Sequence, residues 1–384
     1  MRIALVNRFC PPDPAPTGLA MAELAADLAA ALPEAEVRIF TTGGSYRKGG
    51  EVVPTGIDGC VGVTRVPPVG FGARGVGRLV ASLIDGRRLA ARATAWADTV
   101  ISLTDPPLQG FWMGRATRRR RVRWAEWTMD LYPQAFVAAG LAGAGNPIVG
   151  ALAGAQRRRA PDLDICLGPA QLDHVRRERG SGRAGLVLPT GLFDSEPLDP
   201  PEWRRNESRT VLAYAGNLGE AHSADSVARL VERASPERFL FLFAPHGSRA
   251  NALRHRLDGA PHVLWSERLD AAALDHADAH IVSLRPGWEH VCVPSKALSA
   301  FSRGRPVLFL GSADSDSWRF ARGAGWLVPE PPSDAAIDAA LEAVADPAGL
   351  AAATEAAVAA HARLAGIRAE GLSRLLEWLR AGRA

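Results

Sequence analysis

Short apolar runs of strand length alternate with helical segments along almost the whole chain, and this alternation limits the fold more than any other feature. Residues 3–6 form the first such run, a proline-rich loop follows over residues 7–18, and leucines then recur at helical spacing within residues 20–32. A strand followed by a helix and by another strand is typical of a parallel sheet with helices on its faces. The sequence therefore predicts an α/β protein.

The alternation forms two successive series. The predicted strands are residues 3–6, 37–40, 99–103, 122–127, 164–167, 186–188, 211–214, 239–243, 263–264, 280–284 and 307–310. A proline-rich segment, Pro197-Leu198-Asp199-Pro200-Pro201, separates the two series, and 384 residues exceed the size of a single hydrophobic core. We therefore expect two α/β domains with a cleft, in which ligands bind at the carboxyl ends of the strands.

The composition gives no sign of a fibrous, disordered or membrane-spanning chain. Hydrophobic residues make up 47% and charged residues 22%, and no apolar run reaches the length of a transmembrane helix. The net charge of +4 comes mostly from arginine, which permits an anionic substrate or a membrane surface as a partner. The four cysteines lie far apart, and the start MRIALVNRF is typical of a strand rather than a signal peptide. A cytoplasmic protein with reduced thiols is expected.

Residues 279–311 combine a strand, a polar loop, a helix start and a second strand. Pro286-Gly287 breaks the first strand, and Pro294-Ser295-Lys296 is typical of a helix N-terminus. A lysine in the first turn opposes the helix dipole, whereas a bound anion would reverse that penalty. Helix N–H groups together with Lys296 at the carboxyl edge of a sheet predict a phosphate site, and the alternative is a solvated surface lysine.

Two other loops follow predicted strands. The loop over residues 7–18 ends in Thr17-Gly18, where a helix is expected to begin, and is either a ligand-binding loop or a turn that needs its prolines. Asp130 follows the strand at residues 122–127 and precedes Pro133. It is a candidate catalytic or substrate-binding carboxylate, and its alternative role is a helix or turn cap.

Four consecutive arginines, from Arg118 to Arg121, precede the same strand. They predict a solvated helix C-terminus, which cations favour. Because Trp112 and Trp124 lie nearby in the sequence, a surface for anionic lipid is the alternative.

The segment Gly70-Phe71-Gly72-Ala73-Arg74-Gly75 matches the GxGxxG pattern. It follows Pro67-Pro68, and no acidic residue stands about 20 positions beyond its last glycine. A flexible surface loop is therefore favoured over a dinucleotide site.

Six motifs, taken in order, resemble those of one enzyme family. MRIALVNRFCPP, LTDPPLQG, WTMDLYPQ, LAYAGNLGEAHS, FLFAPHGS and SLRPGWEHVCVPSKALSAFSRGRPVLFLG follow the order of family 4 glycosyltransferases of GT-B fold, in the branch of polysaccharide and natural-product pathways. The resemblance covers nearly the whole chain and implies two Rossmann-like domains that face each other across a cleft. It implies an acceptor-side domain at residues 1–196, a nucleotide-sugar domain at residues 202–365, and a helix at residues 366–384 that crosses back to the first domain.

The resemblance also implies roles for individual residues. Gly216, Asn217 and Gly219 resemble the loop that lets the backbone approach the donor diphosphate, and Lys296 would neutralise its phosphates. Glu289 resembles the first glutamate of the family's Glu-x7-Glu motif. The implied catalytic residues are Asp130, Lys296 and Glu289, and the implied donor-binding residues are Gly18, Gly216, Asn217, Gly219, His222, Gly247, Arg268, Arg285, Ser295 and Ser299.

Two positions depart from the family pattern. Eight residues after Glu289 comes Ala297, and the alignment of the helix places the second glutamate at Ser299, so ribose recognition would pass to another group, such as Asp314 or Asp316. Glu220 stands where a basic residue often follows the glycine loop, so Arg285, Arg268 or His222 would complete the charge balance of the phosphates. A substrate-binding or inactive relative is therefore an alternative.

The expected function is that of a retaining, metal-independent glycosyltransferase. It would move a hexosyl or N-acetylhexosaminyl group from a nucleotide-diphosphate sugar, with a UDP-sugar as the first choice, to a lipid-linked sugar or a small molecule. The alternatives are a non-catalytic nucleotide-sugar-binding subunit and a GT-B nucleotide-sugar epimerase. A peripheral membrane contact is considered, and no cofactor or nucleic acid is expected.

The sequence lacks the motifs that are typical of several other enzyme classes. His276 and His280 are spaced i, i+4, but Ala277 occupies the glutamate position of HExxH. The GxSxG elbow and CxxC pairs are also absent from the sequence. These absences argue against hydrolase and metalloenzyme functions.

Overall fold

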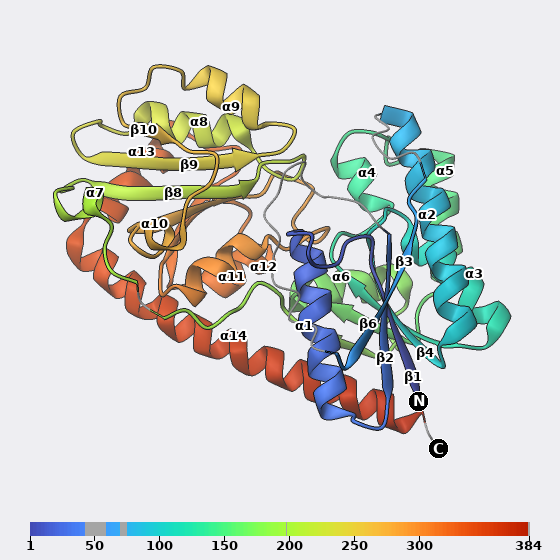
Figure 1. The fold of residues 1–384 in the computed structure, drawn as a ribbon. Helices are drawn as coiled ribbons and strands as arrows, with labels where there is room; N and C mark the ends of the chain where they lie inside the picture. The colour runs from blue at the N-terminus through green and yellow to red at the C-terminus, as the bar shows by residue number, and fades with distance from the viewer. Residues whose placement is uncertain (43–58, 70–74, 197, 383–384) are drawn as a thin grey trace. The chain divides into compact units, whose positions relative to one another are not determined.

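The computed structural model describes residues 1–42, 59–69, 75–196 and 198–382, so most of the GxGxxG match, at positions 70–74, lies outside the described residues. The backbone divides into two compact units, Met1–Leu188 with Arg368–Ala384, and Pro189–Ile367. Each unit contains one parallel β-sheet with helices packed on it, which confirms the predicted α/β class (Figure 1).

The first unit contains a seven-stranded sheet in the order β3-β2-β1-β4-β5-β6-β7. Its strands are β1 (Arg2–Val6), β2 (Glu36–Thr42), β3 (Val61–Val66), β4 (Thr99–Leu103), β5 (Arg123–Thr128), β6 (Leu163–Cys166) and β7 (Gly185–Val187). Every residue of β4 is buried, as expected for a central strand that is covered on both faces. The strand order reverses between β1 and β4, which is where open α/β sheets form a ligand crevice.

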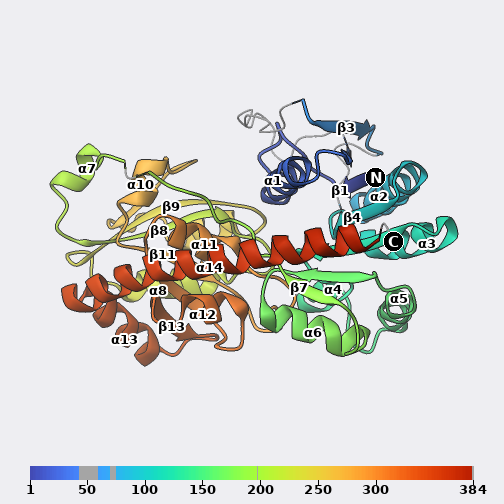
Figure 2. The same ribbon diagram turned by 90° about the horizontal axis from the view of Figure 1, so that it is seen from below.

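Helices cover both faces of this sheet. They are α1 (Pro16–Ala31), α2 (Gly75–Trp96), α3 (Gln109–Arg120), α4 (Gln134–Ala138), α5 (Pro147–Arg158), α6 (Pro169–Arg179) and the last turns of α14 (Pro347–Ala381). Figures 1 and 2 show α1 and the end of α14 on one face, and α2, α3 and α5 beside one another on the other.

The long C-terminal helix packs on the first unit, as predicted. Arg368 Nη2 lies 2.8 Å from Glu23 Oε1. A Cβ on Gly371 would lie only 2.1 Å from the carbonyl oxygen of Val187, so glycine permits the close approach of helix and strand. The helix begins at Pro347, well before the predicted start at residue 366.

The second unit contains a six-stranded sheet in the order β10-β9-β8-β11-β12-β13. Its strands are β8 (Thr210–Asn217), β9 (Phe239–His246), β10 (Val263–Trp265), β11 (Ala279–Ser283), β12 (Val307–Gly311) and β13 (Gly325–Pro329). Its helices are α7 (Glu202–Arg205), α8 (Ala224–Arg233), α9 (Ala250–Arg256), α10 (Ala271–Asp275), α11 (Ser295–Ser302), α12 (Asp316–Ala321) and α13 (Asp334–Ala345). Here the order reverses between β8 and β11.

The helix starts of the second unit differ in their caps. The Ser223 hydroxyl accepts a hydrogen bond from Ser226 N at the start of α8, and Ser333 caps α13 in the same way. In contrast, α11 begins after Pro294, as predicted, and no side chain caps it. The first N–H groups of α11 are therefore left without a side-chain acceptor.

Several local predictions need correction. Strands β8 and β9 extend to Asn217 and His246, so Gly216 and Asn217 belong to a strand end rather than a loop. Helix α1 begins at Pro16, which places Gly18 inside the helix. His276 follows α10 and His280 lies in β11, so the two histidines do not share a helical face.

None of the four cysteines, all of which lie within the described residues, forms a disulfide bond. Within the described ranges no helix combines the length and hydropathy needed to cross a membrane.

Candidate functional site

The end of β8, the loop after it and the start of α11 meet around the side chain of Lys296. Its Nζ lies 3.0 Å from the Tyr214 hydroxyl and 3.2 Å from His222 Nε2, and it also donates to the carbonyl oxygen of Asn217. The ammonium lies 4.6 Å from the centre of the Tyr214 ring. The structure thus brings together three residues that the sequence indicated, and it adds Tyr214, whose position in a buried strand gave no functional signal.

The hydrogen bonds of His222 determine which of its ring nitrogens carries the proton. Nδ1 lies 2.5 Å from the carbonyl oxygen of Ser283, and a carbonyl can only accept, so Nδ1 must donate. Nε2 therefore presents a lone pair to Lys296. Burial, and then the charge of Lys296, lower the pKa of His222 to about 3, so the imidazole is neutral at physiological pH. Because Ser283 ends β11, this contact lies at the point where the strand order reverses.

Lys296 is one of only two lysines in the chain, the other being Lys48. Burial lowers the pKa of Lys296 to about 7, although nearby Cys292 opposes the shift. An arginine could not respond in this way because its guanidinium stays protonated. A lysine at this position can therefore change its charge near neutral pH.

Two glycines, Gly219 and Gly247, lie close to Asn217, and a third, Gly216, precedes it in the chain. A Cβ on Gly247 would lie 2.3 Å from Asn217 Oδ1, and one on Gly219 would lie 3.0 Å from Asn217 Nδ2. Gly216 and Gly247 also have φ values of +100° and +109°, in the left-handed region that favours glycine. The sequence indicated all three, and the structure gives each a steric reason.

Glu220, which departs from the family pattern, is neutralised within its own surroundings. Its carboxylate lies 2.8 Å from Arg249 Nη2 and accepts a hydrogen bond of 2.8 Å from the Ser248 hydroxyl. The Arg249 hydrogen bond is the largest cause that lowers the pKa of Glu220. Arg285 supports the same loop, since it donates to the carbonyl oxygens of Glu220 and Ala221. The sequence did not identify Arg249.

Ser295 and Ser299 hold a neighbouring segment against α11. The Ser299 hydroxyl donates to the carbonyl oxygen of Gly191 over 3.2 Å. A Cβ on Gly191 would lie 2.9 Å from Ser295 Cβ. Ser299, at the position expected for a ribose-binding glutamate, therefore contacts the backbone of Gly191. Of the two substitutes considered, Asp314 is exposed, and Asp316 is fully buried at the start of α12.

The remaining predicted donor residues lie in separate places. Glu289 is half-buried in the turn between β11 and α11, in the same segment as Lys296. Arg268 is exposed in the loop that follows the outer strand β10. Gly18 is buried in α1, where a Cβ would lie 3.1 Å from the backbone of Phe9. Gly18 therefore has a clear packing role within the first unit.

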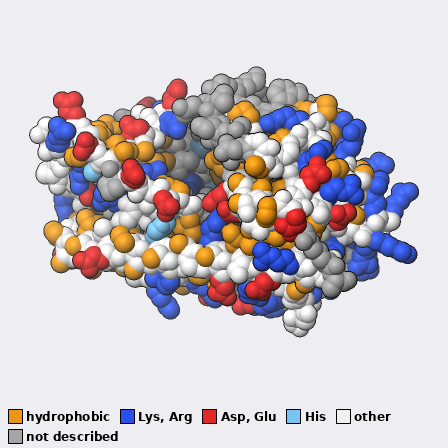
Figure 3. Space-filling view, turned by 60° about the horizontal axis from the view of Figure 1, so that its bottom comes forward, with side chains coloured by type: hydrophobic (Ala, Val, Ile, Leu, Met, Phe, Trp, Pro, Cys, Tyr) orange, Lys and Arg blue, Asp and Glu red, His pale blue; other side chains and the backbone are white. Residues whose placement is uncertain are grey.

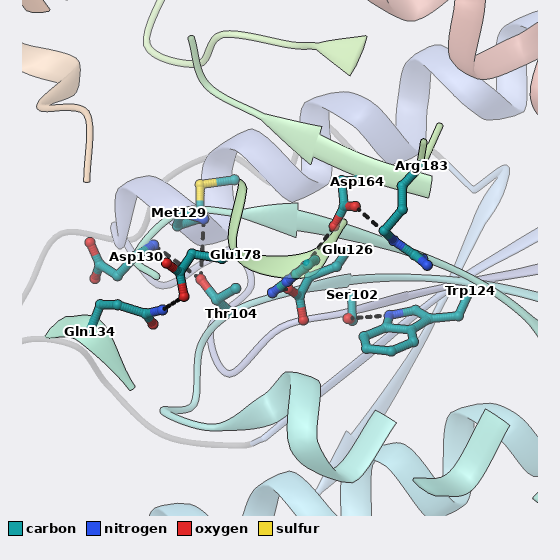
Figure 4. Close-up of polar contacts among 11 residues, drawn as sticks. Ser102, Thr104, Trp124, Glu126, Met129, Asp130, Gln134, Asp164, Glu178 and Arg183 are labelled. Atoms are coloured by element: carbon teal, nitrogen blue, oxygen red, sulfur yellow. Dashed lines mark hydrogen bonds and ion pairs between the residues drawn. The ribbon is translucent and has the colours of Figure 1, made fainter. Parts of the chain in front are cut away.

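Asp130 follows β5 at the carboxyl edge of the first sheet. The Thr104 hydroxyl accepts hydrogen bonds from the backbone N–H groups of Met129 and Asp130, each 3.1 Å long, which fixes the start of this loop (Figure 4). Burial, and then the charge of Asp105, raise the pKa of Asp130 to about 6. Thr104 and Asp105 belong to the LTDPPLQG motif, but the sequence analysis predicted no role for either residue.

Two other acidic side chains in this unit form ion pairs with an arginine and link elements of the fold. Glu126 and Asp164, whose side chains are 1% and 0% exposed, both pair with Arg179, and the Asp164–Arg179 distance is 2.6 Å. The cluster joins β5, β6 and α6. In Figure 4 the Asp130 carboxylate points away from it. No group of three His, Cys, Asp or Glu side chains in the described part of the chain is arranged to hold a metal ion.

Comparisons with known proteins identify the fold. No protein-family model matches the chain, and no curated protein matches it either. Among solved structures, it is similar to sucrose-phosphate synthase from Thermosynechococcus elongatus, with a TM-score of 0.74, 16% identity and 99% of each chain covered. It is also similar to HepE of Anabaena in complex with UDP and glucose, with a TM-score of 0.71, 13% identity, and 99% of this chain and 100% of that one covered.

A third similar structure is WaaG, a glycosyltransferase involved in lipopolysaccharide biosynthesis. The TM-score is 0.64 at 16% identity, and 93% of this chain and 94% of that one are covered. At such identities the likeness bears on architecture alone. With its two parallel sheets and its C-terminal helix on the first unit, the chain has the GT-B fold.

Proposed function

We propose that this chain is a glycosyltransferase that uses a nucleotide-diphosphate sugar, of the family 4 type that its motifs resemble. The observation that carries the proposal is the position of Lys296, in the first turn of the uncapped helix α11 and beside the point where the second sheet reverses its order. Helix N–H groups and a nearby cation are a suitable site for a diphosphate. We assign the nucleotide-sugar side to the second unit and the acceptor side to the first.

Lys296 would act on the leaving group. As the bond between sugar and diphosphate breaks, negative charge grows on the phosphate oxygens, and a preoriented ammonium stabilises that charge more in the transition state than in the ground state. Tyr214, Asn217 and His222 hold Nζ in place before the ligand arrives. A phosphate oxygen would replace one of these partners and would favour the charged form of the lysine.

The donor is proposed to be a UDP-sugar. HepE, which has a similar fold, is known in complex with UDP-glucose, and this supports the choice of base without establishing the sugar. Glu289, in the same segment as Lys296, would contact the donor sugar. Because the Ser299 hydroxyl is occupied by Gly191, we do not assign ribose recognition to it. Retention of the anomeric configuration follows from the family resemblance and is part of the proposal.

Asp130 is proposed to bind the acceptor hydroxyl. With a pKa of about 6, its carboxylate is mostly charged at pH 7 yet basic enough to accept a proton. Asp105 contributes to this basicity through the repulsion of like charges.

A thermal-shift panel of nucleoside diphosphates and nucleotide sugars, followed by product analysis with a range of acceptors, tests the proposal. A ligand at 100 times its Kd stabilises the folded state by about 2.7 kcal/mol, and UDP or a UDP-sugar is expected to give such a shift. Transfer to an acceptor would support the proposed function. Binding without any product would indicate a non-catalytic subunit, and conversion of the donor without an acceptor would indicate an epimerase.

A further inference from the structure

Most cationic side chains of this protein are arginines, and many of them lie on its surface. Arg118 to Arg121, at the end of α3, are all exposed, as expected for a solvated helix C-terminus. Figure 3 shows cationic side chains, in blue, on one face of the molecule. Lys296 differs because it is half-buried and its Nζ contacts neutral groups, without an ion pair to a carboxylate of the described residues. The surroundings of this ammonium therefore need an explanation of their own.

Three acceptors occupy the three N–H groups of the Lys296 ammonium. They are the Tyr214 hydroxyl at 3.0 Å, His222 Nε2 at 3.2 Å and the carbonyl oxygen of Asn217. An ammonium group has three donors and no acceptor, so no N–H is left for a further ligand. A phosphate oxygen can therefore bind Nζ only by replacing one of these three acceptors.

Burial indicates which acceptor is replaced. Tyr214 is fully buried and His222 is 8% exposed, whereas Asn217 is exposed at the end of β8. The hydrogen bond from Lys296 to Asn217 is exposed, and the other two are partly buried. The Tyr214 hydroxyl also donates to the Asn217 carbonyl oxygen over 3.4 Å, so that oxygen keeps a donor when Lys296 leaves it. A phosphate that arrives from solvent would thus take the place of Asn217.

The ring and the hydroxyl of Tyr214 have different surroundings. The ring packs in the core of the second unit, with its centre 6.2 Å from that of the Phe243 ring, and phenylalanine would fill the same space. The hydroxyl is a buried polar group, which costs free energy unless it is hydrogen-bonded, and it contacts Lys296 and Asn217. The hydroxyl, rather than the ring, therefore connects the core to the candidate site.

We propose that Tyr214 is a positioning residue for the reaction: its hydroxyl accepts a hydrogen bond from Lys296 throughout and fixes Nζ while a donor phosphate oxygen replaces the Asn217 carbonyl. His222 is the second inner acceptor, and the carbonyl oxygen of Ser283 holds its ring in turn. The inference rests on the function proposed above and names the residue that orients the ammonium. Burial raises the pKa of Tyr214, so its hydroxyl stays protonated and acts as a hydrogen-bond acceptor rather than as a base.

The charge state of Lys296 gives a readout of this contact. The titratable groups that face Nζ are Tyr214 from β8, His222 from the loop after β8 and Cys292 from the segment before α11. A hydrogen-bond acceptor favours the charged form of a lysine, so loss of the Tyr214 hydroxyl should lower the pKa of Lys296 below its value of about 7. The expected change is about one pH unit, because a hydrogen bond to a charged group contributes about tenfold to an equilibrium.

Nuclear magnetic resonance can follow this titration directly. Lys48 and Lys296 are the only lysines in the chain, so protein labelled with ¹³C at the lysine ε-carbon should give two signals, and the one lost in Lys296→Arg belongs to Lys296. In Tyr214→Phe, which keeps the ring, the Lys296 signal should titrate about one pH unit lower than in the wild-type chain. The Lys48 signal is the internal control and should titrate at the same pH in both. Circular dichroism melting checks that the variant folds.

Kinetics separate a positioning role from a structural one. At pH 6, where about half of the Tyr214→Phe molecules still carry the Lys296 charge, the variant should change the Kd of UDP by less than about threefold. Its kcat should fall by about tenfold, because the ammonium still attracts phosphate but is held less firmly in the transition state. Added to Lys296→Ala, the same change should lower kcat no further, because the hydroxyl acts through the lysine.

Two kinds of failure can be told apart. The positioning role of Tyr214 is wrong if the wild-type chain binds UDP and transfers a sugar while the Lys296 signal titrates at the same pH in Tyr214→Phe. It is also wrong if Tyr214→Phe lowers kcat equally with and without Lys296. If the wild-type chain binds no nucleotide, the proposed function itself is wrong, whatever the lysine titrations show.

Discussion

The carboxyl edges of the two sheets have the same topology but opposite chemistry. At the edge of the second sheet, Lys296 is surrounded by neutral acceptors, and burial lowers its pKa to about 7. At the edge of the first sheet, Asp130 lies near another carboxylate, and burial raises its pKa to about 6. Both groups are thereby moved from their ordinary values toward neutrality, as expected for groups that exchange protons or meet charged ligands.

The difference also separates functional charges from structural ones. Arg179 in the first unit and Arg249 in the second each have carboxylate partners, and these ion pairs join elements of the fold. Lys296 and Asp130 instead have shifted pKa values, because burial outweighs the opposing effect of Cys292 on Lys296 and adds to the repulsion of Asp130 by Asp105. Four predictions follow from this contrast, beginning with the largest effect.

The first prediction separates the two edges by mutation. Lys296→Ala should lower kcat by roughly 10²-fold and also weaken the binding of nucleoside diphosphate, because the ammonium acts on the leaving group. Asp130→Asn should abolish transfer but leave nucleoside-diphosphate binding nearly unchanged. Calorimetry with UDP, run beside a transfer assay, measures both.

Lys296→Arg serves as the charge-conserving control for that pair. It keeps a cation but loses the fitted contacts of Nζ, so it should bind UDP better than Lys296→Ala while remaining slow. The separation of the two edges would be wrong if Asp130→Asn weakened UDP binding as much as Lys296→Ala does.

The second prediction concerns pH. The Asp130 carboxylate is charged above about pH 6, and the free Lys296 ammonium is charged below about pH 7, so kcat/KM should pass through a maximum between these values. Each limb should fall by up to about tenfold per pH unit. In the pH profile of kcat, which reports on the enzyme with bound donor, the alkaline limb should move to higher pH because the diphosphate stabilises the Lys296 ammonium.

One variant assigns the alkaline limb of that profile. Lys296→Arg should remove the alkaline limb, because its guanidinium does not titrate in this range. An alkaline limb that persists unchanged in Lys296→Arg would show that another group controls it.

The third prediction tests the close approach at the second edge. Gly247→Ala should lower the free energy of unfolding by about 1–3 kcal/mol and weaken UDP binding, because the new Cβ meets Asn217 Oδ1 in a backbone conformation of positive φ. Gly259→Ala is the matched control, since Gly259 has a φ of +75° with nothing within 4 Å of its Cβ position. Chemical denaturation should show a smaller loss for Gly259→Ala, and equal losses would argue against the Asn217 contact.

The fourth prediction is the absence of an effect. If Lys296 and the N-terminus of α11 neutralise the diphosphate, EDTA should leave the transfer rate unchanged. A loss of activity with EDTA that magnesium or manganese restores would mean that a metal ion carries this role instead.

Local sequence patterns were sufficient for the architecture. Apolar periodicity, helix starts and proline positions depend on neighbouring residues, so they predicted most of the strands and the start of α11 after Pro294. They missed elements with weaker patterns, such as β3 and α5. Strand β3 lies at the edge of its sheet and is buried only at its two end residues, Val61 and Val66, so it lacks a continuous apolar run.

The sequence by itself determined the α/β class, the two series of strands and the position of a lysine at a helix start. Only the tertiary structure decided what surrounds that lysine, because Tyr214 and His222 reach it from distant segments joined by the order of the second sheet, and Ser283 in turn holds His222. It also decided the tautomer of His222 and the neutralisation of Glu220 by Arg249. Charge, burial and hydrogen bonding at a site depend on neighbours in space. Strand order sets those neighbours, and no local sequence pattern predicts it.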